Sequence, residues 1–206
     1  MITPEGAKSS QLVDGFGPVR VARTPLADPE AYRGTVAPEE WAAAQRLDGR
    51  RRIEHVAGRA AAHAALAAFA PGTVVAITRA ADGAPELRGC QAVLSISHGR
   101  RDAVAAVGRV RALGIDLCDL DDAPRVRRIA PRFLDPGEAA LAHDAADWAA
   151  LWAIKEAAAK ALRRGLLDGG LRASRVIALD PPRLAFPALT AIVVRGERDA
   201  IAVVYG

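Results

Sequence analysis

Charged side chains recur between residues 152 and 163 at the spacing that a helix normally uses for an apolar stripe. Intervals of three and four residues place them on one helical face. This face carries three cations and one carboxylate, so it needs a charged partner, and phosphate groups with a metal ion have the required chemistry. The residues at these intervals are Trp152, Lys155, Glu156, Ala159, Lys160 and Arg163.

A second carboxylate belongs to a short strand pattern at residues 114–119. In a strand, Ile115 and Leu117 face one way, while Asp116 and Cys118 face the other. The apolar pair would enter the core. We therefore expect Asp116 to project toward whatever covers the opposite side of the strand.

Each carboxylate also has an ordinary structural explanation. Asp116 could be a surface residue at a strand end. Glu156 and Lys160 could form an i,i+4 surface ion pair worth about 0.3–0.5 kcal/mol. Taken separately, the two segments do not decide between a structural and a functional role.

The composition predicts a folded, enzyme-sized protein. Hydrophobic residues make up 51% of the 206 residues, and the formal charge of +4 is compatible with an anionic ligand or an acidic partner. No apolar run reaches bilayer length, and residues 1–11 lack the features of a signal peptide. Cys90 and Cys118 are isolated, which argues against a disulfide framework or a zinc site. We expect a cytoplasmic protein.

The periodicity predicts an α+β chain with long helices at residues 50–70 and 147–165 and a short basic helix at residues 125–133. We expect Asp147 to be the N-cap of the second long helix and Gly165 to follow its end. Strands are expected at residues 19–22, 74–78, 93–96, 103–107, 115–117, 176–179, 191–194 and 200–204.

One internal similarity suggests how these elements are organised. Residues 99–105 (GRRDAVA) resemble residues 196–202 (GERDAIA), and each segment is typical of a turn followed by a strand. Coincidence is one explanation of so short a match. The other is that the chain consists of two similar halves, residues 1–110 and 111–206, related by a pseudo-twofold axis. Two such halves in one chain would make a monomer sufficient.

Five motifs occur together, and as an ordered set they resemble the 4′-phosphopantetheinyl transferases. The length of the chain is similar to that of the Sfp-type members, which include those that activate siderophore synthetases. The resemblance covers roughly residues 45–165. The motifs begin at Arg51, Leu94, Gly114, Arg132 and Trp152 and are RRIEHVAGR, LSISH, GID, RFLDPGE and WAIKEAAAK.

The resemblance implies a fold in which each half packs a small antiparallel sheet on a long helix. The N-terminal half would contact the nucleotide of coenzyme A, and the C-terminal half would carry the metal and the catalytic helix. The implied reaction transfers the phosphopantetheine arm of coenzyme A to a serine of an acyl or peptidyl carrier protein and releases adenosine 3′,5′-bisphosphate.

The resemblance also assigns catalytic roles to Asp116, Lys155 and Glu156. Asp116 and Glu156 would bind Mg²⁺, a hard cation that takes oxygen ligands. Lys155 would lie against the phosphates and support the leaving group. Glu156 or a water on the metal would accept the serine proton, and the sequence leaves that choice open.

Further residues would bind the anionic groups of coenzyme A, the co-substrate. Lys160 would bind the pyrophosphate, and Ser97 and His98 would contact the nucleotide phosphates. Arg51 and Arg59 lie two helical turns apart and would hold the 3′-phosphate. A packed or surface histidine and a solvated basic helix face are the structural alternatives.

The loop Gly83-Ala84-Pro85 resembles a Gly-Lys-Pro loop that lies along the adenine in the family. Here Ala84 replaces the lysine, so one phosphate contact is absent and backbone contacts must serve.

Cys118 is the main departure from the family pattern, because most Sfp-type relatives have a glutamate there as a third magnesium ligand. A thiol is a poor ligand for a hard cation. Either the enzyme works with two carboxylates and a water in the third place, or metal binding is weak and activity is impaired. A softer metal bound through Cys118 is a further alternative. Asp119 would reach the metal only if the strand breaks at Cys118.

A basic segment with an apolar centre would suit an acidic carrier protein, although a solvated helix face explains it equally well. Two other functions compete with transfer: a catalytically silent coenzyme A binder, and a nucleic-acid-binding protein suggested by the pI of 9.6. No aromatic stacking platform supports the latter, and we expect neither a nucleic-acid nor a membrane partner. The segment comprises Arg125, Arg127, Arg128, Arg132, Phe133 and Leu134.

Overall fold

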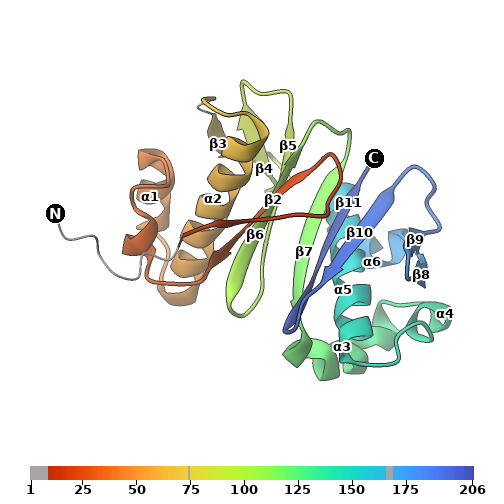
Figure 1. Ribbon diagram of the computed structural model, residues 1–206. Coiled ribbons are helices and arrows are strands. Elements are labelled where there is room, and N and C mark those ends of the chain that lie inside the picture. Colours follow the sequence, from red (N-terminus) through yellow and green to blue (C-terminus); the bar gives the residue numbers. More distant parts are fainter. Residues whose placement is uncertain (1–8, 74, 166–168) are drawn as a thin grey trace.

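Two antiparallel sheets, each packed on one long helix, form the fold (Figure 1). The computed structural model describes residues 9–73, 75–165 and 169–206. The first elements are β1 (Gln11–Val13), β2 (Arg20–Pro25), α1 (Pro38–Ala44), α2 (Gly49–Phe69), β3 (Ala76–Arg79), β4 (Pro85–Arg88), β5 (Val93–His98) and β6 (Asp102–Gly108). They are followed by β7 (Leu113–Asp119), α3 (Ala123–Ile129), α4 (Pro136–Ala139), α5 (Ala145–Ala161), α6 (Leu171–Ala173), β8 (Val176–Leu179), β9 (Pro182–Leu184), β10 (Thr190–Arg195) and β11 (Asp199–Tyr205). Short 3₁₀ helices occupy Pro29–Tyr32, Leu120–Asp122 and Ala130–Arg132.

The same topology occurs twice, so the expected α+β fold with two similar halves is confirmed. The first sheet has the strand order β1-β2-β6-β5, and the second has the order β10-β11-β7. In both, the final strand of the half lies in the middle: β6 between β2 and β5, and β11 between β7 and β10. A long helix, α2 or α5, and a two-stranded hairpin, β3-β4 or β8-β9, separate the corresponding strands. The first copy of this topology ends with β6 at Gly108, and the second copy begins with β7 at Leu113.

The two similar sequence segments form matching turns. The Gly99 N–H donates to the Asp102 carbonyl over 2.8 Å, and the Gly196 N–H donates to the Asp199 carbonyl over 2.8 Å. The turns lead into β6 and β11, the two central strands. The sequence similarity therefore reflects structural equivalence.

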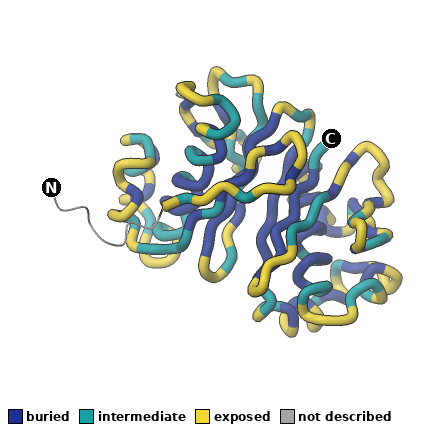
Figure 2. Tube along the Cα trace, in the orientation of Figure 1, coloured by how far each residue is buried: buried dark blue, intermediate teal, exposed yellow. Residues whose placement is uncertain are grey.

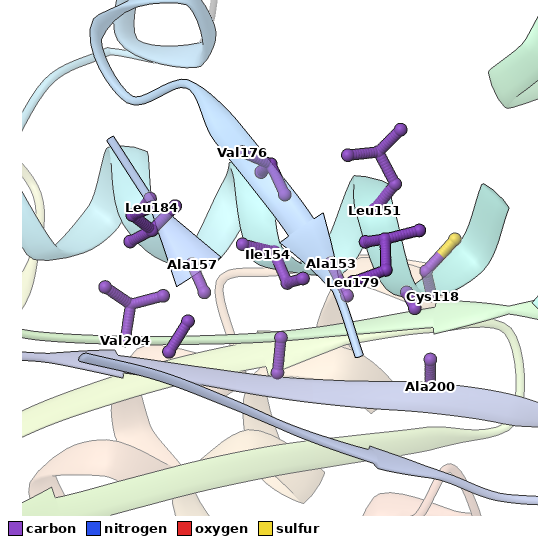
Figure 3. Close-up of a cluster of buried hydrophobic side chains, with 14 of the residues drawn as sticks. Cys118, Leu151, Ala153, Ile154, Ala157, Val176, Leu179, Leu184, Ala200 and Val204 are labelled. Carbon is purple, nitrogen blue, oxygen red and sulfur yellow. The ribbon is translucent and has the colours of Figure 1, made fainter. Parts of the chain in front are cut away.

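Alanine-rich packing brings α5 close to β7. The core under this helix contains small side chains together with Ile154, Leu151 and Val204 (Figure 3). A Cβ on Gly114 would lie 2.7 Å from the Ala161 nitrogen and would also collide with the Ala157 carbonyl. Glycine is required here because the helix backbone occupies that space. The closeness of β7 and α5 positions the side chains that they share.

Buried residues concentrate in the sheets and on the inner sides of the long helices, whereas turns and outer helix faces are exposed (Figure 2). Both β6 and β7 are buried along their whole length. The sheets meet where β5 approaches β7, and the Ile115 N–H donates to the Ser95 hydroxyl over 3.1 Å. None of the helices within the described ranges is long and apolar enough to cross a membrane.

The ends of α5 differ from the expectation. Its N-cap is Asp144, whose carboxylate accepts a hydrogen bond from the Asp147 N–H, so the prediction of Asp147 was wrong by one turn. The helix ends at Ala161, and Arg163 rather than Gly165 takes the left-handed conformation, with φ of 53°. Asp144 and Asp147 are both good N-cap residues, so the sequence did not decide between them. Gly165 was preferred as the end because glycine is the usual residue in the left-handed conformation after a helix.

The other predicted elements are present with shifted ends. The basic helix is shorter than expected, because α3 ends at Ile129 and a 3₁₀ turn follows. The strand expected at residues 74–78 corresponds to β3, and residue 74 lies outside the described residues.

Candidate active site

A cleft of about 730 Å³ lies where the two halves meet. β5 contributes Ser97 and His98 to its wall, β7 contributes Asp116, and α5 contributes Glu156 and Lys160. Most of the residues that the sequence singled out for phosphate and metal chemistry therefore share one cavity.

Lys160 is the centre of a hydrogen-bond network in this cleft. Its Nζ donates to Asp116 Oδ1 over 2.7 Å, to Ser97 Oγ over 2.8 Å and to the Ile115 carbonyl over 3.0 Å. The Ser97 hydroxyl donates to Asp116 Oδ1 over 2.6 Å. Asp116 is buried, so the ammonium and hydroxyl groups stabilise a carboxylate that has lost most of its water.

Glu156 lies one helical turn before Lys160, beside Asp116. Burial and, after it, the nearby Asp116 carboxylate raise the pKa of Glu156 to about 7, although Lys160 and a hydrogen bond from Trp152 act in the opposite direction. The pair thus carries negative charge that Lys160 only partly offsets. Two adjacent carboxylates with excess negative charge are suitable ligands for a hard divalent cation.

Neither possible third ligand offers a free oxygen to a cation. Cys118 lines the first cleft, but it also belongs to an apolar cluster with Leu151 and Ala200, and burial raises the pKa of its thiol far above the ordinary value (Figure 3). β7 does not break at Cys118, and the Asp119 carboxylate accepts hydrogen bonds from the Arg100 N–H and the Arg101 guanidinium. Within the described ranges, no group of three or more His, Cys, Asp or Glu side chains could hold a metal ion.

Lys155 does not face the cleft, which corrects its expected position against the phosphates. Its side chain is fully buried, and Nζ donates to Glu138 Oε1 and to the Ser174 carbonyl, both over 2.6 Å. Burial lowers the pKa of Lys155, and Glu138 acts in the opposite direction. Adjacent helical residues point about 100° apart, so Glu156 reaches the cleft while Lys155 reaches α4 and the segment that precedes β8.

A second cleft of about 500 Å³ adjoins the first, and both are lined by Glu54 and His98. The expected nucleotide residues Arg51 and Arg59 line it from α2, and Gly83 and Pro85 line it from the β3–β4 turn. Ala84 is not among its lining residues, although the Ala84 N–H donates to Asp82 Oδ1 over 3.1 Å. Arg51 is exposed, whereas burial lowers the pKa of Arg59.

Among the lining residues of the second cleft that sequence reasoning missed are the basic side chains of His55 and Arg79. Arg79 ends β3 just before the turn that contains Gly83, so a cation flanking that glycine turn was the available signal. His55 lies one turn before Arg59 on the same face of α2.

The four arginines of the basic segment are exposed beside the first cleft, whereas its two apolar residues are not. Arg125 lines the cleft, and Arg127, Arg128 and Arg132 are exposed. Phe133 packs edge-on against Trp152, with ring centroids 5.9 Å apart. Leu134 is buried in the core under α5, so its expected place on a docking surface is corrected.

Comparison with known protein families gives two matches. Residues 39–108 match the 4′-phosphopantetheinyl transferase N-terminal domain, and residues 112–196 match the 4′-phosphopantetheinyl transferase superfamily. Among curated proteins, no match was found. Family members use coenzyme A as a substrate and act on carrier protein domains. Both matches describe one family and lie on the two halves in order, so the chain belongs to the 4′-phosphopantetheinyl transferase superfamily.

Proposed function

We propose that this protein transfers the phosphopantetheine arm of coenzyme A to a serine hydroxyl of an acyl or peptidyl carrier protein and releases adenosine 3′,5′-bisphosphate. One observation carries the proposal: Asp116, Glu156 and Lys160 share a cleft that continues into a second cleft lined by Arg51 and Arg59. The two clefts match the two anionic parts of coenzyme A, the pyrophosphate and the 3′-phosphate.

The second cleft would bind the nucleotide. Arg51 and Arg59 supply cations for the 3′-phosphate, and Gly83 and Pro85 form a wall along the adenine. His98 borders both clefts and would contact the phosphates between them.

Asp116 and Glu156 would hold Mg²⁺ in the first cleft, which fits their unbalanced negative charge. When bound, the cation offsets charge on the pyrophosphate and polarises the attacked phosphate. Lys160 and Ser97 lie beside this position as donors to phosphate oxygens. Lys160 thereby stabilises the negative charge on the leaving bisphosphate.

Glu156 is the residue best placed to accept the serine proton. It lines the first cleft beside Asp116, where the serine would approach the phosphates. A carboxylate that binds a cation is a weaker base, so the alternative acceptor is a water in the cleft. Lys155 has no part in this step, because its ammonium is paired with Glu138.

The carrier protein would dock on the exposed arginines beside the first cleft. Arg125 lines the cleft, and Arg127, Arg128 and Arg132 extend the positive surface around it. An acidic carrier would be steered to this surface, and Phe133 offers an apolar contact at its edge.

The repeat of topology within one chain also favours the Sfp-type subgroup, a division into residues 1–110 and 111–206, and a monomer. Each sheet and its helix are complete within the chain, so a second copy is not needed to form either cleft.

The test is to incubate the protein with coenzyme A, Mg²⁺ and apo carrier proteins of several classes, and to measure carrier mass. We expect one carrier to gain a phosphopantetheine group on its serine. An Asp116→Asn variant that folds normally should give none. Wild-type rates in that variant would contradict the assigned site.

A catalytically silent coenzyme A binder is the second candidate, and Cys118 is the observation that favours it. The buried thiol adds no carboxylate to Asp116 and Glu156 at this position of β7. Cys118→Glu should tighten Mg²⁺ binding, measured by calorimetry, and Cys118→Ser should not. Unmodified carriers together with measurable coenzyme A binding would support the silent binder.

A further inference from the structure

Arg163 has an unusual backbone conformation at the end of α5. Among the non-glycine residues in the described ranges, it alone has a positive φ, at 53°. Helices commonly end with a glycine in this conformation, and a residue with a side chain is strained there. Such strain suggests that the arginine side chain has a role that glycine could not fill.

The side chain reaches across to the other half of the molecule. Arg163 Nε donates to Asp82 Oδ2 over 2.7 Å, and Nη2 donates to Oδ1 over 2.8 Å. This two-point pairing fixes orientation as well as distance, since the guanidinium and the carboxylate are both planar. Asp82 belongs to the β3–β4 turn, far from Arg163 in sequence.

Asp82 also stabilises the conformation of the β3–β4 turn, which borders the second cleft. Its Oδ1 also accepts a hydrogen bond from the Ala84 N–H over 3.1 Å. That bond, with Arg163 beside it, lowers the pKa of Asp82, so the carboxylate is ionised at neutral pH. Gly83 and Pro85 line the second cleft on either side of Ala84. The Arg163 guanidinium therefore fixes the position of the Asp82 carboxylate, and that carboxylate holds the backbone of the loop at Ala84.

Arg163 also follows the catalytic helix directly. Lys160 and Glu156, which line the first cleft, lie one and two turns earlier on α5. The ion pair between Arg163 and Asp82 thus connects α5, which lines the first cleft, to the β3–β4 turn, which lines the second cleft. Ala84 offers no charged side chain to a nucleotide, so the contribution of this loop depends on where its backbone places Gly83 and Pro85.

We propose that Arg163 is a positioning residue for coenzyme A: through Asp82 it holds the loop of Gly83, Ala84 and Pro85 against the nucleotide. This inference rests on the proposed function. The pair is partly exposed, with side-chain exposed fractions of 49% and 41%, so its loss should weaken coenzyme A binding by about three- to fivefold. The effect should shrink at high salt, because the pair is screened.

The decisive variant is Arg163→Gly, because it removes the side chain and relieves the backbone at once. We expect it to melt at or above the wild-type temperature, yet to bind coenzyme A and adenosine 3′,5′-bisphosphate three- to fivefold more weakly in calorimetry. KM for coenzyme A should rise by the same factor, with kcat unchanged. Arg163→Lys should recover part of the affinity, and Arg164→Ala is the matched control at the exposed neighbouring arginine.

Asp82→Asn separates the ion pair from the turn. The asparagine can still accept from the Ala84 N–H, but it cannot form the charged two-point pair. We expect it to weaken binding as Arg163→Gly does, and the double variant to be no worse than either. Arg163→Gly with wild-type affinity would overturn this inference alone. Failure of the wild-type protein to bind coenzyme A would overturn the proposed function as well.

Discussion

Asp102 and Asp199 bind the same guanidinium, that of Arg23. Arg23 Nη2 donates to Asp102 Oδ2 and to Asp199 Oδ2, and Nη1 donates to Asp199 Oδ1 over 3.2 Å. The two aspartates begin β6 and β11 and occupy equivalent positions after the matching turns. Arg23 on β2 therefore joins the two halves at symmetry-related points.

Arg23→Met should destabilise the protein by about 2–4 kcal/mol, because it leaves two buried carboxylates without their cation. Urea unfolding measures this loss. In an Asp102→Asn background the same substitution should cost less, since one charge has already been removed. An equal cost in both backgrounds would contradict the shared pairing.

Glu156→Gln should raise stability above pH 7 when metal is chelated. The pKa of Glu156 is raised from 4.5 to about 7 in the folded protein, so its contribution to stability is full below pH 4.5 and is lost as pH rises through 7. The neutral glutamine avoids this loss, which is of the order of 3 kcal/mol. Thermal melts across this pH range measure the difference.

Added Mg²⁺ provides the control for Glu156→Gln. It should raise the melting temperature of the wild-type protein and not that of the variant. Equal Mg²⁺ responses in the two proteins would remove Glu156 from the metal site.

Lys155→Met should destabilise the protein by about 3–5 kcal/mol, because Glu138 would remain buried and charged. Adding Glu138→Gln should restore part of the loss, since the glutamine oxygen can still accept from the Val176 N–H. Denaturant unfolding of the single and double variants tests this. A Lys155→Met protein with normal stability but lost coenzyme A affinity would return Lys155 to the phosphate site.

Gly114→Ala should displace α5 from β7, because the new methyl group would meet the backbone at Ala157 and Ala161. We expect a loss of at least about 3 kcal/mol and weaker Mg²⁺ binding, since Asp116 and Glu156 would separate. Gly34→Ala is the matched control, because no heavy atom lies within 4 Å of its Cβ position. Equal melting temperatures of the two variants would show that the close packing is not needed.

Local patterns in the sequence predicted the repeated fold well. Residues 99–105 and 196–202 share a turn-strand pattern that depends on neighbouring residues alone, so the equivalence of β6 and β11 was visible. The contacts of Arg23 were not visible, because they join three strands that the sequence does not place relative to one another.

The sequence predicted those site residues whose position depends only on the direction of a side chain from a single helix or strand. Asp116, Glu156 and Lys160 follow from strand alternation and helical spacing, and the structure brings them into one cleft. Lys155 was misplaced because helical spacing allows a broad face, and only the packing of α4 against β8 shows that Glu138 lies behind it. Leu134 was misplaced for a similar reason, since its burial depends on α5.

The central position of β11 has a consequence for synthesis on the ribosome. β7, which carries Asp116, pairs with β11, and β11 is the last strand of its sheet to be translated. Until residues 199–205 leave the exit tunnel, the nascent chain exposes an unpaired β7 edge. The candidate active site can therefore be completed only after translation of nearly the entire described chain.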